Sequence, residues 1–342
     1  MKQIRTVDAL GHILCHDITQ IVKDVTKEVA FRKGHVVREE DIPVLLSLGK
    51  DHLYIWEMQP GMRHENDAAE ILCELCMGER IDRSSRAKEG KIDLFAATDG
   101  LFCVDVEALA AVNGLEDIVI ASRHNCVPVK SGEKLAGMRV IPLVIHEDKL
   151  EEARRAAGNV PLMQVRPYRP LQVGIVTTGN EVYHGRIEDT FTPVIRGKLA
   201  EYGLIECGHH ILPDDKEQIA DAIRSLLDSG AEMILCTGGM SVDPDDVTPG
   251  AIRASGAEVV SYGAPVLPGS MFLMAYMPDG TPIMGLPGCV MYTKTTVFDL
   301  ILPQVAAGLV ITKEQLARMG HGGLCLGCKP CIYPLCPFGK GV

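Results

Sequence analysis

Short apolar runs alternate with amphipathic segments between residues 171 and 309. The amphipathic segments carry helix-start and helix-stop residues; in the first, Thr192 is the expected N-cap, Pro193 the first helical residue and Gly203 the residue after the helix. Strands that alternate with helices predict a mostly parallel sheet with helices on both faces. We therefore expect a three-layer α/β domain over residues 171–309. The apolar runs that predict its strands cover residues 172–177, 204–211, 232–236 and 282–286.

The N-terminal half has a less regular pattern. Residues 1–58 contain strand-like runs at 13–18 and 52–56 and an expected helix at 39–48, which together predict a small α+β module. Residues 59–165 mix expected helices with short strands, so we expect a second, mixed α+β region there.

Three prolines, Pro161, Pro167 and Pro170, hold the chain extended and mark the expected boundary before the α/β domain. A cysteine-rich tail covers residues 320–342. The length of 342 residues agrees with two or three domains, at roughly 100–200 residues per domain.

Composition narrows the class of protein. Hydrophobic residues make up 46% of the chain and charged residues 23%, values typical of globular proteins, so neither disorder nor membrane insertion is expected. No apolar run reaches the roughly 18 residues of a spanning helix, and residues 1–18 lack the apolar centre of a signal peptide. We therefore expect a cytoplasmic protein without a membrane partner. The formal charge of −11 argues against nucleic acid as a partner.

Acidic turns follow the expected parallel strands. Glu181 follows the first strand, Asp214 and Asp215 follow the second, and Asp246 belongs to an acidic cluster after the third. Because ligands bind at the carboxyl ends of parallel strands, we expect these turns to converge. Glycines at 238–239 let backbone N–H groups approach an oxyanion, while carboxylates suit Mg²⁺. The alternative is that turns are rich in such residues in any case.

Four motifs in this region resemble those of the molybdopterin-binding domain shared by MoeA-like, gephyrin E-domain and MogA-like proteins. The resemblance covers about 140 residues, with the motifs in the family's order and spacing. It implies a three-layer α/β domain that holds a phosphorylated pterin dithiolene. The motifs are Thr178-Gly179-Asn180-Glu181, Pro213-Asp214-Asp215, Thr237-Gly238-Gly239-Met240-Ser241-Val242 with Asp246, and Leu286-Pro287-Gly288.

The resemblance also implies a function in molybdenum cofactor biosynthesis, as a molybdopterin molybdotransferase that inserts molybdate into adenylylated molybdopterin with Mg²⁺ as cofactor. By motif position, Glu181, Asp215 and Asp246 would be catalytic, and Asp214 and Asp246 would bind the metal. The residues expected to bind the pterin and its phosphate are Thr178, Gly179, Thr237, Gly238, Gly239, Ser241, Pro287 and Gly288.

Several positions depart from the family pattern. Asn180 replaces an aspartate, Ser270 replaces a lysine and Cys289 replaces an asparagine. Asn180 and the lost lysine favour an alternative: a non-catalytic protein with a redox or metal-binding tail that binds molybdopterin or the finished cofactor and passes it to a molybdoenzyme client. The retained acidic residues favour the enzyme. The oligomeric state stays open, with the homodimer common in the family as one option.

The tail carries four closely spaced cysteines, Cys325, Cys328, Cys331 and Cys336. Their C-x2-C-x2-C-x4-C spacing approaches a bacterial ferredoxin pattern, so we expect an iron–sulfur cluster or a Zn²⁺ site. The alternative is a flexible, reduced tail without metal. The family that the chain resembles does not generally carry this tail.

Other cysteines and histidines suggest less. Cys73 and Cys76 lie three residues apart on an expected helix, where core packing is the favoured interpretation. Cys289 stands at an expected helix N-terminus, which tends to lower a thiol pKa. His209 and His210 alternate faces of an expected strand, so we interpret them as structural.

Overall fold

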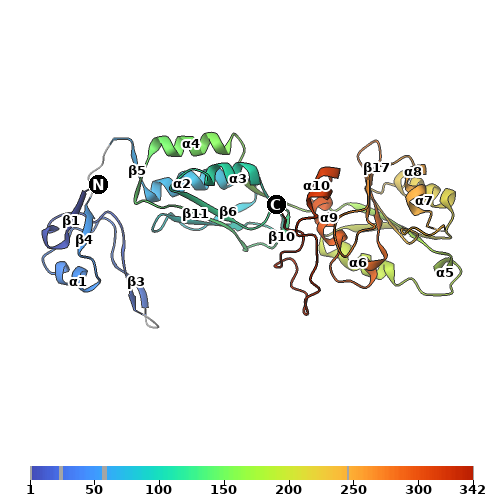
Figure 1. Ribbon diagram of the computed structural model, residues 1–342, viewed down its shortest axis with the longest axis horizontal. Helices are drawn as coiled ribbons and strands as arrows, with labels where there is room; N and C mark the ends of the chain where they lie inside the picture. The colour runs from blue at the N-terminus through green and yellow to red at the C-terminus, as the bar shows by residue number, and fades with distance from the viewer. Residues whose placement is uncertain (1, 23–25, 56–59, 245, 342) are drawn as a thin grey trace. The chain divides into compact units, whose positions relative to one another are not determined.

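The computed structural model describes residues 2–22, 26–55, 60–244 and 246–341 (Figure 1). The chain folds into two compact units. Unit one contains residues 1–97, 104–123 and 131–165, and unit two contains residues 98–103, 124–130 and 166–342. Two short segments that precede residue 165 therefore belong to unit two, and no sequence signal marks them.

The start of unit one is built around a small apolar core that includes Leu14, Leu45 and Leu53. The strand expected at 13–18 is largely wrong, because Ile13 and Leu14 form isolated bridges and a strand begins only at Ile18. Residue 56, the end of another expected strand, lies outside the described residues. The elements are β1 (Lys2–Arg5), which pairs antiparallel with β4 (His52–Ile55), η1 (Thr6–Asp8), the hairpin β2 (Ile18–Val22) and β3 (Thr26–Phe31), and α1 (Asp41–Ser47).

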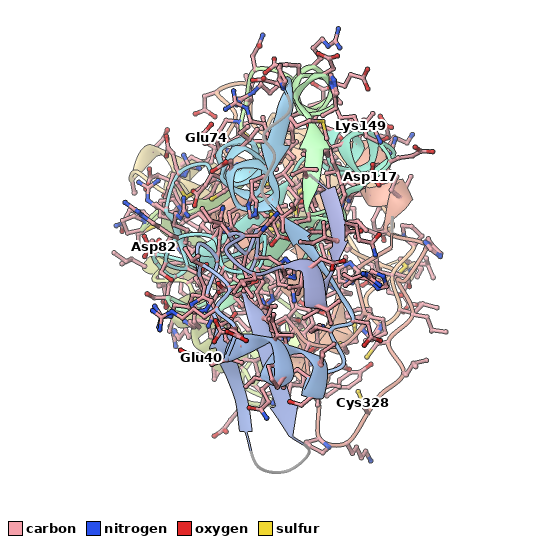
Figure 2. All side chains as sticks on the ribbon, turned by 90° about the vertical axis from the view of Figure 1, so that its left-hand side faces the viewer. Glu40, Glu74, Asp82, Asp117, Lys149 and Cys328 are labelled. Atoms are coloured by element: carbon pink, nitrogen blue, oxygen red, sulfur yellow. The ribbon has the colours of Figure 1, made fainter. Side chains whose placement is uncertain are left out.

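The rest of unit one contains an antiparallel sheet in the order β6-β7-β11-β9. Helix α2 packs on β11 and β7, and α3 contacts α4. Lys149 of α4 pairs with Asp117, which directly precedes β9, at 2.7 Å (Figure 2). Helix α2 buries Cys73 and Cys76, which confirms that they pack in the core. The elements are β5 (Met62–His64), α2 (Glu65–Cys76), β6 (Ile81–Arg83), β7 (Lys91–Ala96), α3 (Val106–Asn113), β9 (Ile118–Ser122), β11 (Lys134–Val140), β12 (Val144–His146), α4 (Glu147–Ala157) and β13 (Met163–Arg166).

Unit two contains a six-stranded sheet in the order β15-β14-β16-β19-β18-β17. The pairs β14–β15, β14–β16 and β16–β19 are parallel, whereas β17–β18 and β18–β19 are antiparallel. All residues of β16 and β19 are buried, as expected for strands covered on both faces. The strands are β14 (Gln172–Thr178), β15 (Ile205–Leu212), β16 (Met233–Thr237), β17 (Glu258–Tyr262), β18 (Leu273–Tyr276) and β19 (Pro282–Leu286).

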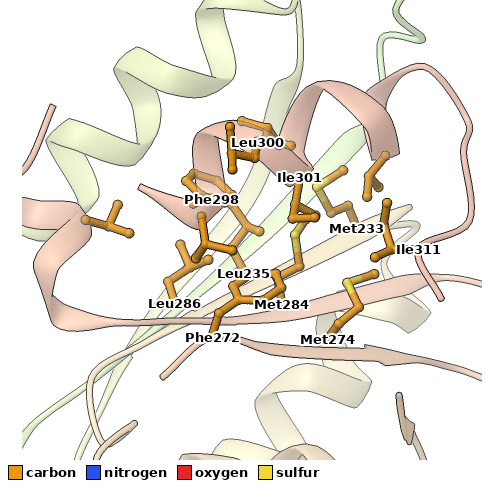
Figure 3. Close-up of a cluster of buried hydrophobic side chains, with 14 of the residues drawn as sticks. Met233, Leu235, Phe272, Met274, Met284, Leu286, Phe298, Leu300, Ile301 and Ile311 are labelled. Carbon is orange, nitrogen blue, oxygen red and sulfur yellow. The ribbon is translucent and has the colours of Figure 1, made fainter. Parts of the chain in front are cut away.

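Alternate residues of these strands enter two separate apolar cores. On one face, Leu235 and Met284 pack with Phe298 of α9 and with α6 (Figure 3). On the other face, Ile234 and Cys236 pack with α7 and α8. The domain therefore has three layers, as the sequence pattern predicts. The helices are α5 (Asn180–Tyr183), α6 (Phe191–Glu201), α7 (Lys216–Asp228), α8 (Thr248–Ala254), the 3-10 helix η2 (Gly288–Met291), α9 (Val297–Ala306) and α10 (Lys313–Arg318).

Two expected helix starts are wrong. Helix α6 begins at Phe191 instead of Pro193, because the carboxylate of Asp189 accepts the N–H groups of Phe191 and Thr192, at 2.9 and 3.0 Å. The helix expected after Gly288 is only a four-residue 3-10 helix. The expected stop of α6 is confirmed, since Gly203 follows the helix with a φ of +69°.

The cysteine-rich tail packs against the core of unit two. Phe338 is 3% exposed, and the Tyr333 hydroxyl donates to the carbonyl of Asp299 at 3.1 Å. Leu324 forms a parallel bridge with Leu267. The structure therefore shows a packed tail and not the flexible tail that the sequence left as an alternative. Among the described residues, no helix combines the length and apolar character needed to cross a membrane.

Candidate functional site

A pocket of about 570 Å³ opens at the carboxyl ends of the parallel neighbours β16 and β19. The glycine-bearing turn after each strand forms part of its wall, and residues 268–271 form another part. Five of the eight residues expected to bind the pterin line it. The lining residues are Phe191, Gly238, Gly239, Met240, Ser241, Asp246, Pro268, Gly269, Ser270, Met271, Leu286, Pro287, Gly288, Cys289, Met291 and Tyr292.

The two glycines after β16 are required by close backbone packing. Gly238 and Gly239 have φ values of +83° and +53°, which L side chains rarely adopt. A Cβ on Gly238 would lie 2.1 Å from the carbonyl oxygen of Thr178, and one on Gly239 would lie 2.8 Å from Oγ1 of Thr248. The glycines thus let the ends of β14 and β16 approach each other and shape the floor of the pocket.

Hydrogen bonds hold the turn after β16 in place. The Tyr262 hydroxyl donates to the carbonyls of Met240 and Ser241, at 2.9 and 3.0 Å. Oγ1 of Thr248 donates to the carbonyl of Gly238 at 2.9 Å. Burial, with a contribution from the nearby charge of Asp246, raises the pKa of Tyr262, so the phenol stays protonated as a donor. The sequence did not suggest Tyr262, because β17 carries no motif.

Asp246 is the one predicted acidic residue that lines the pocket. Its carboxylate accepts the N–H of Asp243 at 2.8 Å, and its own N–H donates to the carbonyl of Asp243 at 3.0 Å. This tight turn fixes the carboxylate on a short loop beside the glycines. Asp243 itself does not line the pocket.

The other predicted acidic residues lie outside the pocket lining. Asp214 accepts the N–H of Asn180 at 2.9 Å, which ties together the turns after β14 and β15. Asp215 is the N-cap of α7, where its carboxylate accepts the N–H of Gln218 at 2.9 Å. Glu181 lies in the first turn of α5, beside Gly179. The structure therefore joins two of the three acidic turns to each other and places only Asp246 in the pocket wall.

Thr178, Gly179 and Thr237 also lie outside the lining, although they were expected to bind the ligand. Thr178 and Thr237 are 4% and 0% exposed. Oγ1 of Thr178 lies 3.3 Å from Oγ1 of Thr248, and Oγ1 of Thr237 donates to Oγ1 of Thr177 at 3.3 Å. These threonines brace the strand ends beneath the pocket.

Sequence reasoning missed the aromatic and thioether side chains of the pocket. Phe191 and Met291 line its wall, and Tyr292 lies at its mouth with 77% of its surface exposed. An exposed aromatic ring beside a pocket offers a flat face on which a planar ligand can stack. No periodicity marks these residues, because Tyr292 follows a short 3-10 helix and Phe191 begins α6.

Cys289 also lines the pocket, but burial raises the pKa of its thiol instead of lowering it. The helix start expected there is the 3-10 helix η2, which is too short to provide a strong dipole. The expectation of a lowered pKa is therefore wrong.

The comparison with known families agrees with this geometry. Residues 174–307 match the family model described as a probable molybdopterin binding domain. Residues 3–57 match a second family model, described as a domain of unknown function (DUF8806).

Curated relatives match part of the chain. A molybdopterin molybdenumtransferase from Synechococcus elongatus is 24% identical over 180 residues, which cover 50% of this chain and 42% of the relative. One from Haemophilus influenzae is 27% identical over 158 residues, 44% of this chain and 38% of the relative. A CinA-like protein from Mycobacterium avium is 36% identical over 91 residues, 26% of this chain and 21% of the relative. The chain thus spans less than half the length of these relatives.

A solved structure with a related name is the molybdopterin biosynthesis enzyme MoaB from Thermus thermophilus. It is 24% identical, with 40% of this chain and 97% of that chain covered and a TM-score of 0.35.

A second pocket, of about 350 Å³, adjoins the first pocket, and Lys198 and Lys294 line it. Met291 and Tyr292 line both pockets. The ammonium group of Lys198 pairs with the carboxylate of Asp299 and donates to the carbonyl of Lys294 at 3.0 Å. The side chain of Lys294 is exposed. Positive charge is therefore available beside the pocket, although Ser270 stands where the family has its lysine.

No cluster of three or more His, Cys, Asp or Glu side chains within the described ranges is arranged to hold a metal ion. Cys325 and Cys336 pack against the domain core, and Cys328 is exposed (Figure 2). Cys331 lies 3.4 Å from Oγ1 of Thr295, a contact that lowers the pKa of its thiol. The structure thus does not bring the four tail thiols together, and the iron–sulfur or Zn²⁺ site stays a prediction.

His209 belongs to a buried polar network at the ends of β14 and β15. Its Nε2 lies 3.0 Å from Oγ1 of Thr177 and 3.3 Å from Oγ1 of Thr192. Burial lowers the pKa of His209, which favours the neutral imidazole. This residue supports the strand ends, in agreement with a structural interpretation.

Proposed function

We propose that the chain binds molybdopterin in the pocket at the ends of β16 and β19 and inserts molybdate into adenylylated molybdopterin. The observation that carries this proposal is the shared pocket wall. It joins the glycine turn at 238–239 and Ser241 with Asp246 and with Pro287 and Gly288, residues that come from separate motifs. The match of residues 174–307 to the molybdopterin-binding family supports the ligand.

The roles follow from the chemistry of the lining groups. Backbone N–H groups of the glycine turns would hold the pterin phosphate, because no Cβ keeps the oxyanion at a distance. The exposed ring of Tyr292 would stack on the pterin. Lys294, beside the pocket, would attract the molybdate anion.

Asp246 would hold Mg²⁺. This cation commonly uses one or two carboxylates together with substrate phosphates and waters, so a single carboxylate in the pocket wall fits it. When bound, Mg²⁺ would act as a Lewis acid that neutralises charge on the phosphates. The hydrogen bond from Asp243 orients the Asp246 carboxylate for this purpose.

A carrier that binds molybdopterin without turnover, and passes it to a molybdoenzyme client, is the second candidate. Two observations favour it. Glu181, Asp214 and Asp215 lie outside the pocket lining, and Ser270 leaves the pocket wall without a lysine. A carrier needs the glycine turns and the aromatic mouth but no catalytic carboxylate.

The test is turnover of adenylylated molybdopterin with molybdate and Mg²⁺, together with pterin binding by fluorescence. Asp246→Asn keeps an oxygen that can accept the N–H of Asp243 but removes the charge. For the enzyme, we expect Asp246→Asn to lose about 100-fold or more in rate, a value typical of a lost charge-stabilising group, with little change in pterin binding.

Asp243→Asn is the matched control, since Asp243 lies on the same loop and does not line the pocket. It should retain most of the activity. Tight pterin binding without turnover in the unmodified protein would favour the carrier. Absence of pterin binding would contradict both candidates.

A further inference from the structure

Two cysteines of unit two lie next to each other where two strands meet. β8 (Gly100–Val104) pairs antiparallel with β10 (Val127–Val129), and Val127 lies opposite Phe102. Cys126 and Cys103 are the residues next to this last strand pair; Cys103 lies on β8, and Cys126 belongs to the turn before β10, with a φ of +55°. The two thiols are in hydrogen-bond contact. Sγ of Cys103 also lies 3.7 Å from the carbonyl oxygen of Leu101, and Sγ of Cys126 lies 3.5 Å from Oδ1 of Asn125.

This placement suits a disulfide without rearrangement of the strands. Residues directly opposite each other in antiparallel strands have Cα atoms about 4.5 or 5.5 Å apart. Disulfides span Cα separations of about 4.4–6.8 Å, so the last strand pair, Val127 opposite Phe102, brings the two adjoining residues, Cys126 and Cys103, close to this range. The contact between the thiols shows that both side chains point to the same side of the ribbon.

The surroundings make Cys103 the more reactive thiol. The hydrogen bond from Cys126 lowers the pKa of Cys103, and the positive charge of Arg166 lowers it further, against the effect of burial. The same hydrogen bond raises the pKa of Cys126. Nε of Arg166 is buried and finds no hydrogen-bond partner among the residues that the structure describes, so one donor of this guanidinium is not used by them.

Accessibility separates this pair from several other cysteines. Cys103 and Cys126 are both partly exposed. By contrast, Cys73 and Cys76 are 1% and 0% exposed, and burial raises the pKa of both thiols, that of Cys76 to about 12. The Cys103–Cys126 pair is therefore more accessible to a small disulfide in solution than the pair on α2.

We propose that Cys103 and Cys126 are a redox-active dithiol that reacts with low-molecular-weight disulfides such as oxidised glutathione. The Cys103 thiolate attacks one sulfur of the disulfide, forms a mixed disulfide and releases one glutathione thiolate. Cys126 then loses its proton to water and attacks Sγ of Cys103, which releases the second glutathione thiolate. The two cysteines lose two electrons and two protons in total, and one glutathione disulfide becomes two glutathione thiols.

The site is independent of the pocket and of the proposed function. No residue of the β8–β10 ribbon lines either pocket of the molybdopterin-binding domain described above. A failure of the molybdotransferase assay therefore does not bear on this proposal, and oxidation of the pair is measured without any pterin.

The experiment uses the full chain, reduced under nitrogen and then exposed to oxidised glutathione. Remaining thiols are blocked with N-ethylmaleimide, and peptides are mapped by mass spectrometry. We expect a peptide pair linked through Cys103 and Cys126 to dominate the products of these two residues. Recovery of both as blocked thiols would overturn the proposal, and this measurement needs no variant.

Variants then test the order of the steps. Cys126→Ser should retain glutathione on Cys103, because no resolving thiol remains, whereas Cys103→Ser should leave Cys126 unmodified. Equal glutathionylation of Cys126 in Cys103→Ser would contradict the assignment. Arg166→Gln should slow the modification of Cys103 about three- to tenfold, since the thiolate loses a nearby positive charge, and Arg166→Lys should restore most of the rate. Cys207→Ser removes an exposed cysteine of β15 and should change nothing.

Discussion

Replacement of Gly238 by alanine tests the close packing on which the pocket depends. Gly238 adopts a φ of +83°, and an added Cβ would lie 2.1 Å from the carbonyl oxygen of Thr178. Gly203 is the matched control. It has a similar φ of +69°, but a Cβ there would meet nothing within 4 Å. Both alanines have the unfavourable backbone conformation, and only the one at 238 also has the clash.

The magnitudes separate the two variants. The left-handed conformation costs a non-glycine residue about 1–2 kcal/mol, and we expect this loss for Gly203→Ala. In Gly238→Ala, the Thr178 carbonyl must also withdraw from 2.1 Å to an ordinary contact of 3.4 Å or more. Overpacking of this kind costs about 1–3 kcal/mol. Gly238→Ala should therefore lose about 1–3 kcal/mol more unfolding free energy than Gly203→Ala.

Calorimetry is the suitable assay, because a chain with two units can unfold in more than one transition. For a unit of this size, 1 kcal/mol lowers Tm by about 2–4 °C, so the two variants should differ by about 2–12 °C in the transition of unit two. Equal Tm values for Gly238→Ala and Gly203→Ala would refute the close approach of β14 and β16. Pterin binding should also weaken in Gly238→Ala alone.

Two further predictions concern residues outside the pocket lining. Asp215→Ala should lose about 1 kcal/mol of unfolding free energy, whereas Asp215→Asn, which can still cap α7, should lose little; similar loss in both would contradict the capping role. His209 has a lowered pKa in the folded state, so between that value and about 6.5 the unfolded chain binds more protons and stability rises with pH. The stability is complete above about pH 6.5 and is lost as the pH falls through the folded-state pKa. Urea unfolding at several pH values should therefore show a smaller loss of unfolding free energy at acidic pH in His209→Gln than in the unmodified protein. The same dependence of unfolding free energy on pH in both proteins would contradict burial of a neutral imidazole.

The sequence predicted the strands that form short, uninterrupted apolar runs. β14, β16 and β19 appear as short apolar runs, because both faces of these strands are buried. β18 was missed although most of its residues are buried, and β17, which pairs at the edge of the sheet with only partly buried residues, was missed as well. The hydroxyl of Tyr262 on this strand fixes the pocket loop, so a functional contact was missed together with the strand.

The site was predicted in outline. The glycine turns after β16 and β19 meet in one pocket because parallel neighbours end at the same edge. Three acidic turns were expected to converge for the same reason. The pattern could not show that the carboxylate of Asp215 turns toward its own helix, or that Asn180 holds Asp214. Strand order predicts where a turn lies, whereas the direction of a side chain depends on the nearest free N–H group.

The packing of the tail links its cysteine chemistry to the stability of the whole domain. Cys325 and Cys336 contact the apolar core, and Phe338 is buried beside them. An ion bound by all four thiols would have to draw Cys325 and Cys336 away from the core, so its apparent affinity would be reduced by the free energy of that packing. By reciprocity, each gain in metal occupancy would loosen the packing of these two cysteines against the core. Thermal stability measured against metal concentration would therefore report occupancy of the tail without spectroscopy of the metal.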